Sequence, residues 1–169
     1  LRSKKLADYS EPREVPDGLF TQCPGCKATI YKKQYEEHLY TCPTCNWHFR
    51  ITTNEYVEIL FDPHTFVETH VEVKSTDALQ FVDTKPYIDR LNEAYAKSEF
   101  HDALTTGYGE INSIPVSYAC MNFRFIGGSM GSVVGEKFYR AAKYALEKHI
   151  PLITITASGG ARMQESALS

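Results

Sequence analysis

Four of the five cysteines form two closely spaced pairs, a pattern that suits the binding of one metal ion. Cys23 and Cys26, and then Cys42 and Cys45, are each separated by two residues, and fifteen residues lie between the pairs. This spacing lets both sulfurs of one turn face the same cation, and the spacer predicts a hairpin that brings the second pair opposite the first. Four thiolates fill the tetrahedral shell of Zn²⁺ and leave no position for water, so the pattern predicts one structural zinc ion per chain.

Paired cysteines also occur in redox motifs and in iron sites of the rubredoxin kind. A redox motif needs a single pair after a strand of a β-α-β unit, whereas two pairs are present here; iron in place of zinc stays an open alternative. Four thiolates leave no place for His38 or His48 in the shell, and Cys120 is expected to be a buried apolar side chain. Because the ribbon has few apolar residues, metal binding should supply on the order of 10 kcal/mol of its folding free energy.

Two glycine-rich segments lie further along the chain, at 127–131 (G-G-S-M-G) and 158–162 (S-G-G-A-R). Neither is a phosphate-binding P-loop, because Gly135 is followed by Glu136 and Lys137 in place of Lys and Ser or Thr. The dinucleotide pattern G-x-G-x-x-G and the nucleophile pattern G-x-S-x-G are also absent from both segments. Tight turns remain the simplest alternative, while bare N–H groups on paired glycines, or at a helix start just beyond them, could stabilise an oxyanion.

The pattern of apolar residues predicts the elements that hold these segments. A short helix around 56–60 should end at Asp62-Pro63, residues 77–85 read as a loop, and a second helix should begin at Pro86. A strand over 115–125, a helix over 134–146 and a strand over 152–157 follow, with one glycine segment after each strand. This order predicts a β-α-β crossover that brings the two glycine segments to the same edge of a sheet.

Composition narrows the class of protein. The chain has 169 residues, of which 18 are basic and 21 acidic, so its net charge of −3 gives no general attraction to nucleic acid or anionic membrane. It has no apolar run long enough to span a bilayer and no signal peptide, which predicts a cytoplasmic protein with reduced thiols. Residues 1–19 are polar and aperiodic and read as a tail or linker, and the start at Leu1 suggests processing or truncation.

The ribbon, followed by G-G-S-M-G-S-V-V-G-E-K and then A-S-G-G-A-R-M-Q-E, resembles the β subunit of bacterial-type acetyl-CoA carboxylase carboxyltransferase. The resemblance runs from about Val15 to the end of the chain. It implies an α/β fold in which a zinc ribbon at 20–50 precedes a crotonase-like domain of ββα units, with 51–169 its N-terminal part. Members of this family are longer than this chain, so a truncated crotonase-like domain is expected.

The same resemblance implies the reaction and its partners. A carboxyl group would pass from carboxybiotin, on a biotin carboxyl carrier protein, to acetyl-CoA, giving malonyl-CoA for fatty acid synthesis within an ATP-dependent holoenzyme. Biotin would be held mainly by a carboxyltransferase α subunit in an α2β2 heterotetramer. The protein would act by placement and by stabilising the enolate oxygen, with little use of side-chain acids or bases.

Site residues follow from the same family. The N–H groups of Gly159 and Gly160 would hold the thioester enolate oxygen. Arg162 would anchor its loop or contact a CoA phosphate, and a plain structural salt bridge is an equal alternative. The acetyl-CoA side of the pocket would be shaped by the first glycine segment, Gly127, Gly128, Ser129, Met130 and Gly131.

Two other functions stay open at this point. The ribbon could be a nucleic-acid or protein binding module without catalysis, although its basic residues, such as Lys32 and Lys33, are offset by Glu36 and Glu37. The second alternative is a carboxyltransferase for propionyl-CoA. The ribbon favours acetyl-CoA by resemblance only.

Overall fold

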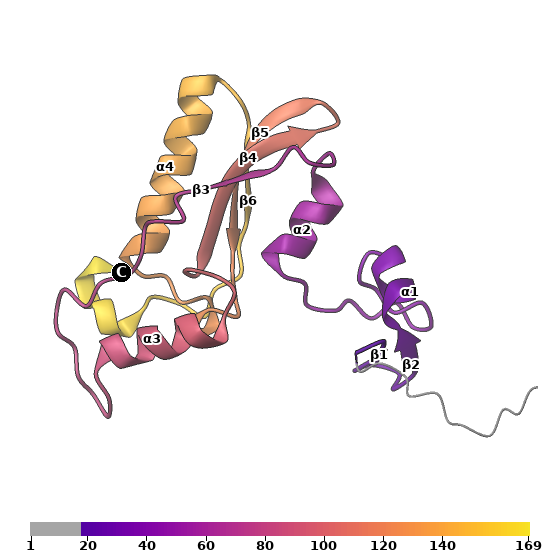
Figure 1. Cartoon of the computed structure of the whole chain (residues 1–169), viewed down its shortest axis with the longest axis horizontal. Coiled ribbons are helices and arrows are strands. Elements are labelled where there is room, and N and C mark those ends of the chain that lie inside the picture. The colour runs from indigo at the N-terminus through magenta and orange to yellow at the C-terminus, as the bar shows by residue number, and fades with distance from the viewer. Residues whose placement is uncertain (1–17) are drawn as a thin grey trace, which may run out of the picture. The chain divides into compact units, whose positions relative to one another are not determined.

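The computed structural model describes residues 18–169 and divides the chain into two compact units, Leu1–Ile51 and Thr52–Ser169 (Figure 1). The tail expected over residues 1–19 falls almost entirely outside the described residues. Within residues 18–169, no helix has both the length and the hydrophobicity required to cross a membrane.

In the first unit, each cysteine pair lies in a tight turn of its own. Strand β1 (Phe20–Gln22) pairs antiparallel with β2 (Thr29–Tyr31) around the first pair, and a bridge between Thr41 and His48 closes the turn around the second. Between the pairs, β2 runs into the short helix α1 (Lys32–Glu37). The prediction that the spacer is itself a hairpin is therefore wrong, because the hairpins enclose the knuckles and the spacer holds a strand and a helix.

The apolar core of this unit is small. The Tyr35 ring contacts the rings of Tyr40 and Phe49 edge-on, with centroid distances of 5.0 and 4.6 Å, and Ile30 is also buried. Other large apolar side chains, among them Trp47, remain about half exposed. So few buried side chains agree with a fold that depends on bound metal.

The second unit is built on a four-stranded sheet in the order β3-β4-β5-β6. Strands β3, β4 and β5 are antiparallel, and β6 is parallel to β5. The strands are β3 (Val67–Thr69), β4 (Leu104–Ile111), β5 (Ile114–Met121) and β6 (Leu152–Ile155); the helices are α2 (Thr53–Leu60), α3 (Tyr87–Lys97) and α4 (Ser132–Lys148), with 3₁₀ segments η1 (Ile126–Gly128) and η2 (Met163–Leu168).

The predicted β-α-β crossover is confirmed, with α4 connecting the parallel strands β5 and β6. The predicted helices near 56–60 and after Pro86 are also present as α2 and α3. Helix α2 begins in a capping box, in which the Thr52 hydroxyl accepts from the Glu55 N–H and the Glu55 carboxylate accepts from the Thr52 N–H.

Both predicted strands of the crossover end earlier than expected, and the strand predicted over 152–157 ends at Ile155. The strand expected over 115–125 ends at Met121, because the next residue, Asn122, is buried and its side-chain amide donates to the Asp102 carbonyl and to the Thr105 hydroxyl. Strand β4, which the sequence patterns do not predict, contains Gly107 and Gly109. A Cβ on Gly107 would lie 2.5 Å from the Phe66 ring, so this glycine makes room for an aromatic side chain.

Helices cover both faces of the sheet (Figure 1). On one face, α4 packs on a core of small and aliphatic residues from β4 and β5, including Leu104, Ala119 and Met121. On the other face, α2 packs against Val116, Tyr118 and the buried Cys120. Cys120 is thus the buried side chain that the sequence predicts.

Candidate functional site

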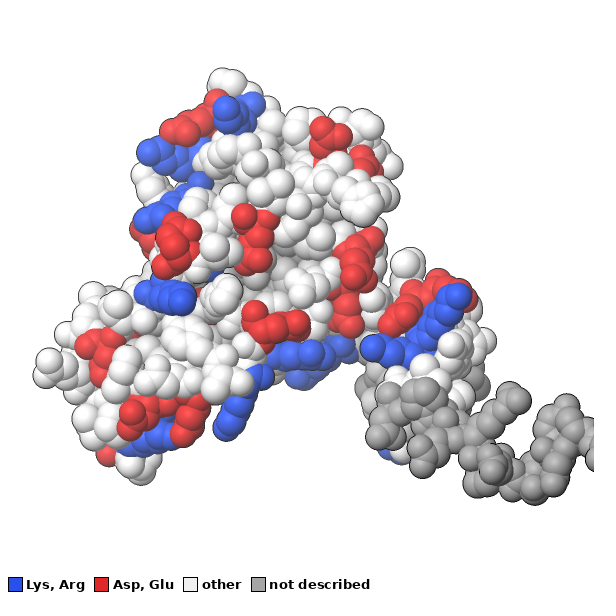
Figure 2. All heavy atoms as spheres, in the orientation of Figure 1, with Lys and Arg blue, Asp and Glu red and all other residues white. Residues whose placement is uncertain are grey.

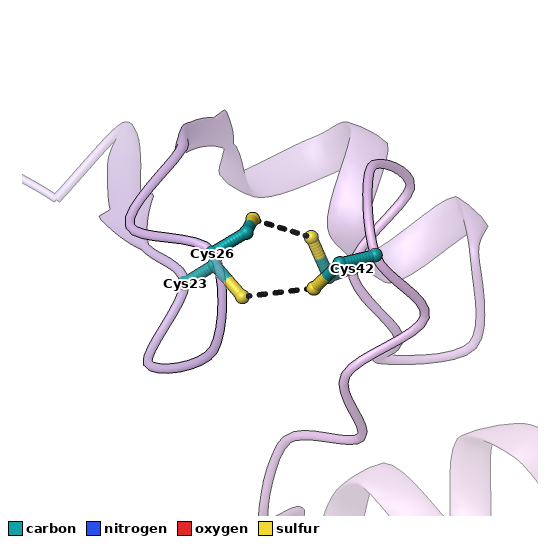
Figure 3. Close-up of side chains that lie close together, drawn as sticks. Cys23, Cys26 and Cys42 are labelled. Carbon is teal, nitrogen blue, oxygen red and sulfur yellow. Dashed lines mark hydrogen bonds between the residues drawn. The ribbon is translucent and has the colours of Figure 1, made fainter.

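The four cysteine sulfurs of the first unit converge on one point (Figure 3). All four Sγ atoms lie within 4.8 Å of one another, with Cys23 3.6 Å from Cys45 and Cys26 3.7 Å from Cys42. Sulfurs placed about 2.3 Å from a central zinc ion would lie about 3.8 Å apart, and a disulfide would bring them to about 2.05 Å. The spacing therefore fits a tetrahedral metal shell and rules out disulfides.

The surroundings of this cluster favour one thiolate and oppose another. At Cys45 a hydrogen bond with the Trp47 backbone lowers the pKa, but burial and the neighbouring thiols of Cys26, Cys23 and Cys42 outweigh it and raise the pKa to about 12. Burial raises the pKa of the Cys42 thiol, but hydrogen bonds from the backbone N–H groups of Cys45 and Thr44 outweigh it and lower the pKa to about 6. His38 and His48 are both exposed, as the filled shell predicts. Four thiolates leave no open position on a bound zinc ion, so the site is structural.

In the second unit, the two glycine segments lie side by side. The backbone N–H of Met130 donates to the Gly160 carbonyl, and the backbone N–H of Arg162 donates to the Met130 carbonyl, each at 2.8 Å. These two bonds form an isolated parallel bridge between Met130 and Ala161, outside the strands themselves. The crossover thus brings both segments to one edge of the sheet, as the sequence predicts.

The first segment needs glycine for its backbone and for its close contacts. Gly127 and Gly128 have φ angles of 63° and 66°, in the left-handed region that glycine adopts readily. A Cβ on Gly128 would lie 2.5 Å from the Ala157 carbonyl oxygen, so a side chain there would separate the segments. The positive φ angles and the missing side chain together allow the backbones of the two glycine segments to lie close to each other at this edge of the sheet.

The N–H groups expected to be bare have acceptors in this structure. The Gly159 N–H donates to the Gly127 carbonyl, and the Gly160 N–H donates to the Ser158 hydroxyl, both at 3.0 Å. Ser158 Oγ in turn donates to the Gly128 carbonyl at 2.8 Å. An oxyanion would therefore have to replace these acceptors before both N–H groups could bind it.

The helix start beyond the first segment is also occupied. Helix α4 has Gly131 at its N-cap, without a capping side chain, and its Ser132 N–H donates to the Glu165 carboxylate at 2.6 Å. The second segment leads into a 3₁₀ turn, η2, in place of an α-helix. The anion at the start of α4 is thus the protein's own carboxylate, contrary to the expectation of unpaired N–H groups there.

Arg162 is fully buried, and Nε, Nη1 and Nη2 of its guanidinium all donate hydrogen bonds to acceptors inside the protein. Nη2 donates to Asp102 at 2.9 Å and Nη1 to Ser75 at 2.7 Å, and Nε donates to the Ser129 hydroxyl at 3.1 Å. Burial lowers the pKa of Arg162, but the hydrogen bond and charge of Asp102 outweigh it and hold the pKa above its ordinary value. Of the roles expected for Arg162, anchoring the loop fits this environment, and contact with a CoA phosphate does not.

A pocket of about 580 Å³ lies beside the glycine segments, on the α4 side of the sheet. Its walls are mostly apolar, and Met130, Gly131 and Ala161 bring both segments to its rim. A volume of this size can accept a small molecule or part of one.

Sequence patterns did not indicate the partners of Arg162. Asp102, Tyr87 and Ser75 come from three distant parts of the chain, and each is buried in the structure. Glu165 follows Arg162 closely, and that proximity was the one local signal for its part in this cluster.

A family model of the carboxyl transferase domain matches residues 50–169, which is most of the chain. The chain belongs to this carboxyl transferase family. A model of the acetyl-CoA carboxylase zinc finger domain matches residues 20–45, a range that contains all four cysteine ligands. The zinc site and the glycine segments therefore lie in separately matched domains.

Similar curated proteins carry one name. Acetyl-coenzyme A carboxylase carboxyl transferase subunit beta of Pedobacter heparinus is 45% identical to this carboxyl transferase chain, and that of Chlorobium limicola is 47% identical, each over 99% of the chain. The chain spans 60% of the length of each of these two relatives.

Solved structures agree on the fold. Transcarboxylase 12S, crystallised with hydrolysed methylmalonyl-coenzyme A, matches with a TM-score of 0.56 and 28% identity, over 70% of this chain and 21% of that one. The beta subunit of geranyl-CoA carboxylase from P. aeruginosa matches with a TM-score of 0.52 and 19% identity, over 81% and 21% of the two chains, and supports the fold alone. The expected fold class, a zinc ribbon followed by the first part of a crotonase-like α/β domain, is confirmed.

Proposed function

We propose that this chain belongs to the β subunit of acetyl-CoA carboxylase carboxyltransferase, which transfers a carboxyl group from carboxybiotin to acetyl-CoA and produces malonyl-CoA. The observation that carries the proposal is the pairing of a carboxyl transferase domain with the acetyl-CoA carboxylase zinc finger in one chain. The names of relatives at 45% and 47% identity support the same reaction. This reaction is the first committed step of fatty acid synthesis.

The glycine segments would act on the thioester. When bound, carboxybiotin would supply carbon dioxide and a base for the acetyl methyl proton. The N–H groups of Gly159 and Gly160 would then donate to the enolate oxygen, after exchanging the Gly127 carbonyl and the Ser158 hydroxyl for it. Donors aimed at charge that develops in the transition state lower the barrier more than they stabilise the substrate.

The acyl group would lie in the apolar pocket at the rim of these segments. Gly127, Gly128 and Ser129 would form the backbone wall on the side of the first segment, and Met130 and Gly131 line the pocket itself. An apolar, largely preformed pocket holds an acetyl group without using charged side chains. Arg162 would contribute by fixing the loop from behind.

The zinc ribbon would have a structural part in this protein. Cys23, Cys26, Cys42 and Cys45 hold the metal, and the closed shell offers no position for a substrate. The partners would be a carboxyltransferase α subunit, in an α2β2 assembly, and a biotin carboxyl carrier protein. A cytoplasmic location goes with these partners.

A ribbon that only binds nucleic acid is less well supported. Figure 2 shows basic and acidic side chains side by side on the visible part of the ribbon. On the ribbon, Lys32 Nζ lies 3.9 Å from Glu36 Oε1, so the two side chains form an ion pair. A nucleic-acid footprint would gather basic residues on one face.

The test is reconstitution of a full-length protein carrying this chain with an α subunit, assayed for malonyl-CoA decarboxylation in the presence of biotin. Activity is expected only with both subunits, and methylmalonyl-CoA should be the poorer substrate. Gly159→Val and Gly160→Val should each lower kcat about 100-fold or more, since each bulky side chain disturbs one donor. Activity that survives both substitutions, or a preference for methylmalonyl-CoA, would contradict the proposal.

A further inference from the structure

A buried cluster around Arg162 lies directly behind the glycine segments. Its guanidinium donates to Asp102 and Ser75, and also to the Tyr87 hydroxyl at 3.2 Å and the Glu165 carboxylate at 3.3 Å. Tyr87 donates to Glu165 at 2.6 Å. Tyr87, Asp102, Arg162 and Glu165 are each at most 3% exposed, so this is an internal network and not a surface ion pair.

The cluster makes contact both with the first glycine segment and with the start of α4. Arg162 donates to both the hydroxyl and the carbonyl oxygen of Ser129, at 3.1 and 2.9 Å. The second oxygen of Glu165 accepts from the Ser132 N–H at 2.6 Å. Arg162 ends the second segment and Glu165 lies three residues beyond it, so their side chains connect the second segment to Ser129 of the first and to Ser132 at the start of α4.

Gly131 leaves room for this connection. A Cβ at this position would lie 2.7 Å from Glu165 Oε1 and 2.9 Å from Arg162 Nη1. As the N-cap of α4, Gly131 offers no side chain to the free N–H groups of the first turn. Glu165 supplies the missing cap from another part of the chain, and a negative charge there is favoured by the helix dipole.

Glu165 is poorly placed to act on a substrate. Its two oxygens already accept hydrogen bonds from Tyr87, Arg162 and Ser132. Burial raises the pKa of Glu165, but the hydrogen bonds from Tyr87 and Ser132 outweigh it and lower the pKa below its ordinary value. An ionised carboxylate with its oxygens in use orients its neighbours and does not exchange protons near neutral pH.

We propose that Glu165 is a positioning residue of the active site: held by Tyr87 and Arg162, it fixes the start of α4 at Ser132 and so sets the spacing of the two glycine segments. The inference rests on the proposed function, because that spacing matters for catalysis only if the Gly159 and Gly160 N–H groups bind the enolate oxygen. Glu165 itself does not touch the substrate. A displacement of about 1 Å in such donors can cost about 100-fold in rate.

The test is Glu165→Gln in the reconstituted full-length enzyme. Glutamine keeps the shape but loses the charge, so kcat should fall about 10- to 100-fold while KM for acetyl-CoA changes less than about twofold. Hydrogen exchange of the peptide covering residues 129–135 should quicken about tenfold, because the Ser132 N–H loses its charged acceptor. Glu147→Gln, an exposed site on the same helix that pairs with Lys143, is the matched control and should change neither quantity.

Each outcome decides the proposal. An unchanged kcat, or a rise in KM alone, would overturn it. If Glu165→Gln does not fold, Tyr87→Phe removes only the hydroxyl that holds Glu165 and should lower kcat about tenfold; wild-type kcat in that variant would overturn the proposal too. If the wild-type enzyme transfers no carboxyl group, the proposed function fails, and the exchange measurement still shows whether Glu165 fixes these segments.

Discussion

Asp102 Oδ1 accepts a hydrogen bond from Arg162 Nη2 at 2.9 Å, and neither side chain has exposed surface. Asp102 lies two residues before β4 and Arg162 ends the second glycine segment, so this ion pair connects the sheet to the site. Asp102 also accepts from the Ser75 hydroxyl at 2.9 Å, and its carboxylate is thus held from two sides.

Asp102→Asn should destabilise the full-length protein by about 3 kcal/mol, because the buried Arg162 charge would keep only the more distant Glu165 carboxylate, at 3.3 Å, as an ionised partner. Urea unfolding of the variant and the wild type measures this difference. Asp83→Asn is the control, since Asp83 pairs with Arg90 at the surface, where the expected loss is below about 1 kcal/mol. An equal loss of unfolding free energy in the two variants would show that burial does not strengthen the ion pair between Asp102 and Arg162.

Acid should weaken the protein through Glu165. The pKa of Glu165 is below its ordinary value in the folded state, so its stabilising contribution is complete above the unfolded pKa and is lost as pH falls through the folded pKa. The groups that face it are Tyr87, Arg162 and the Ser132 N–H, with Asp102 beyond Arg162. The stability difference between wild type and Glu165→Gln should therefore shrink as the pH falls below the ordinary value of 4.5, and a constant difference would contradict this account.

Removal of zinc should unfold the ribbon. Cys26→Ser deletes one of the four ligands, and the small core around Tyr35 is insufficient to keep the unit folded. Metal analysis should give one zinc per chain for the wild type and much less for the variant, with loss of the near-ultraviolet signal of Trp47. Cys120→Ala is the control, because Cys120 lies in the other unit and should leave the zinc content unchanged. Bound iron in place of zinc, or wild-type metal content in Cys26→Ser, would contradict the assignment.

Two substitutions in the β4–β5 hairpin should act in opposite directions. Asn112 and Ser113 form its turn with φ angles of 50° and 63°, and Ser113→Gly should stabilise the protein by about 1 kcal/mol, because glycine adopts this conformation without strain. Gly107→Ala should destabilise by about 1–3 kcal/mol, because its Cβ would lie 2.5 Å from Phe66. Thermal unfolding of both variants measures the signs, and a shift of the same sign in both would contradict the geometry.

Local patterns in the sequence were enough for several features. The spacing of the four cysteines determines the metal site, because two residues between ligands is a property of one turn. The crossover from β5 through α4 to β6 follows from the change between helical and strand periodicity, and from glycines placed after each strand. The two segments then meet because neighbouring parallel strands end at the same edge of a sheet.

Tertiary structure decided what local patterns could not. Gly107 lies inside strand β4, where a Cβ would lie 2.5 Å from the ring of Phe66, forty-one residues earlier in the chain. The N–H groups of Gly159 and Gly160 have internal acceptors, and the start of α4 is capped by Glu165, thirty-three residues further on. The sequence by itself determined which residues could hold a metal or an oxyanion. Only the packing of distant segments decided which of their N–H groups already donate to acceptors within the protein, because hydrogen bonds between buried groups depend on the whole fold.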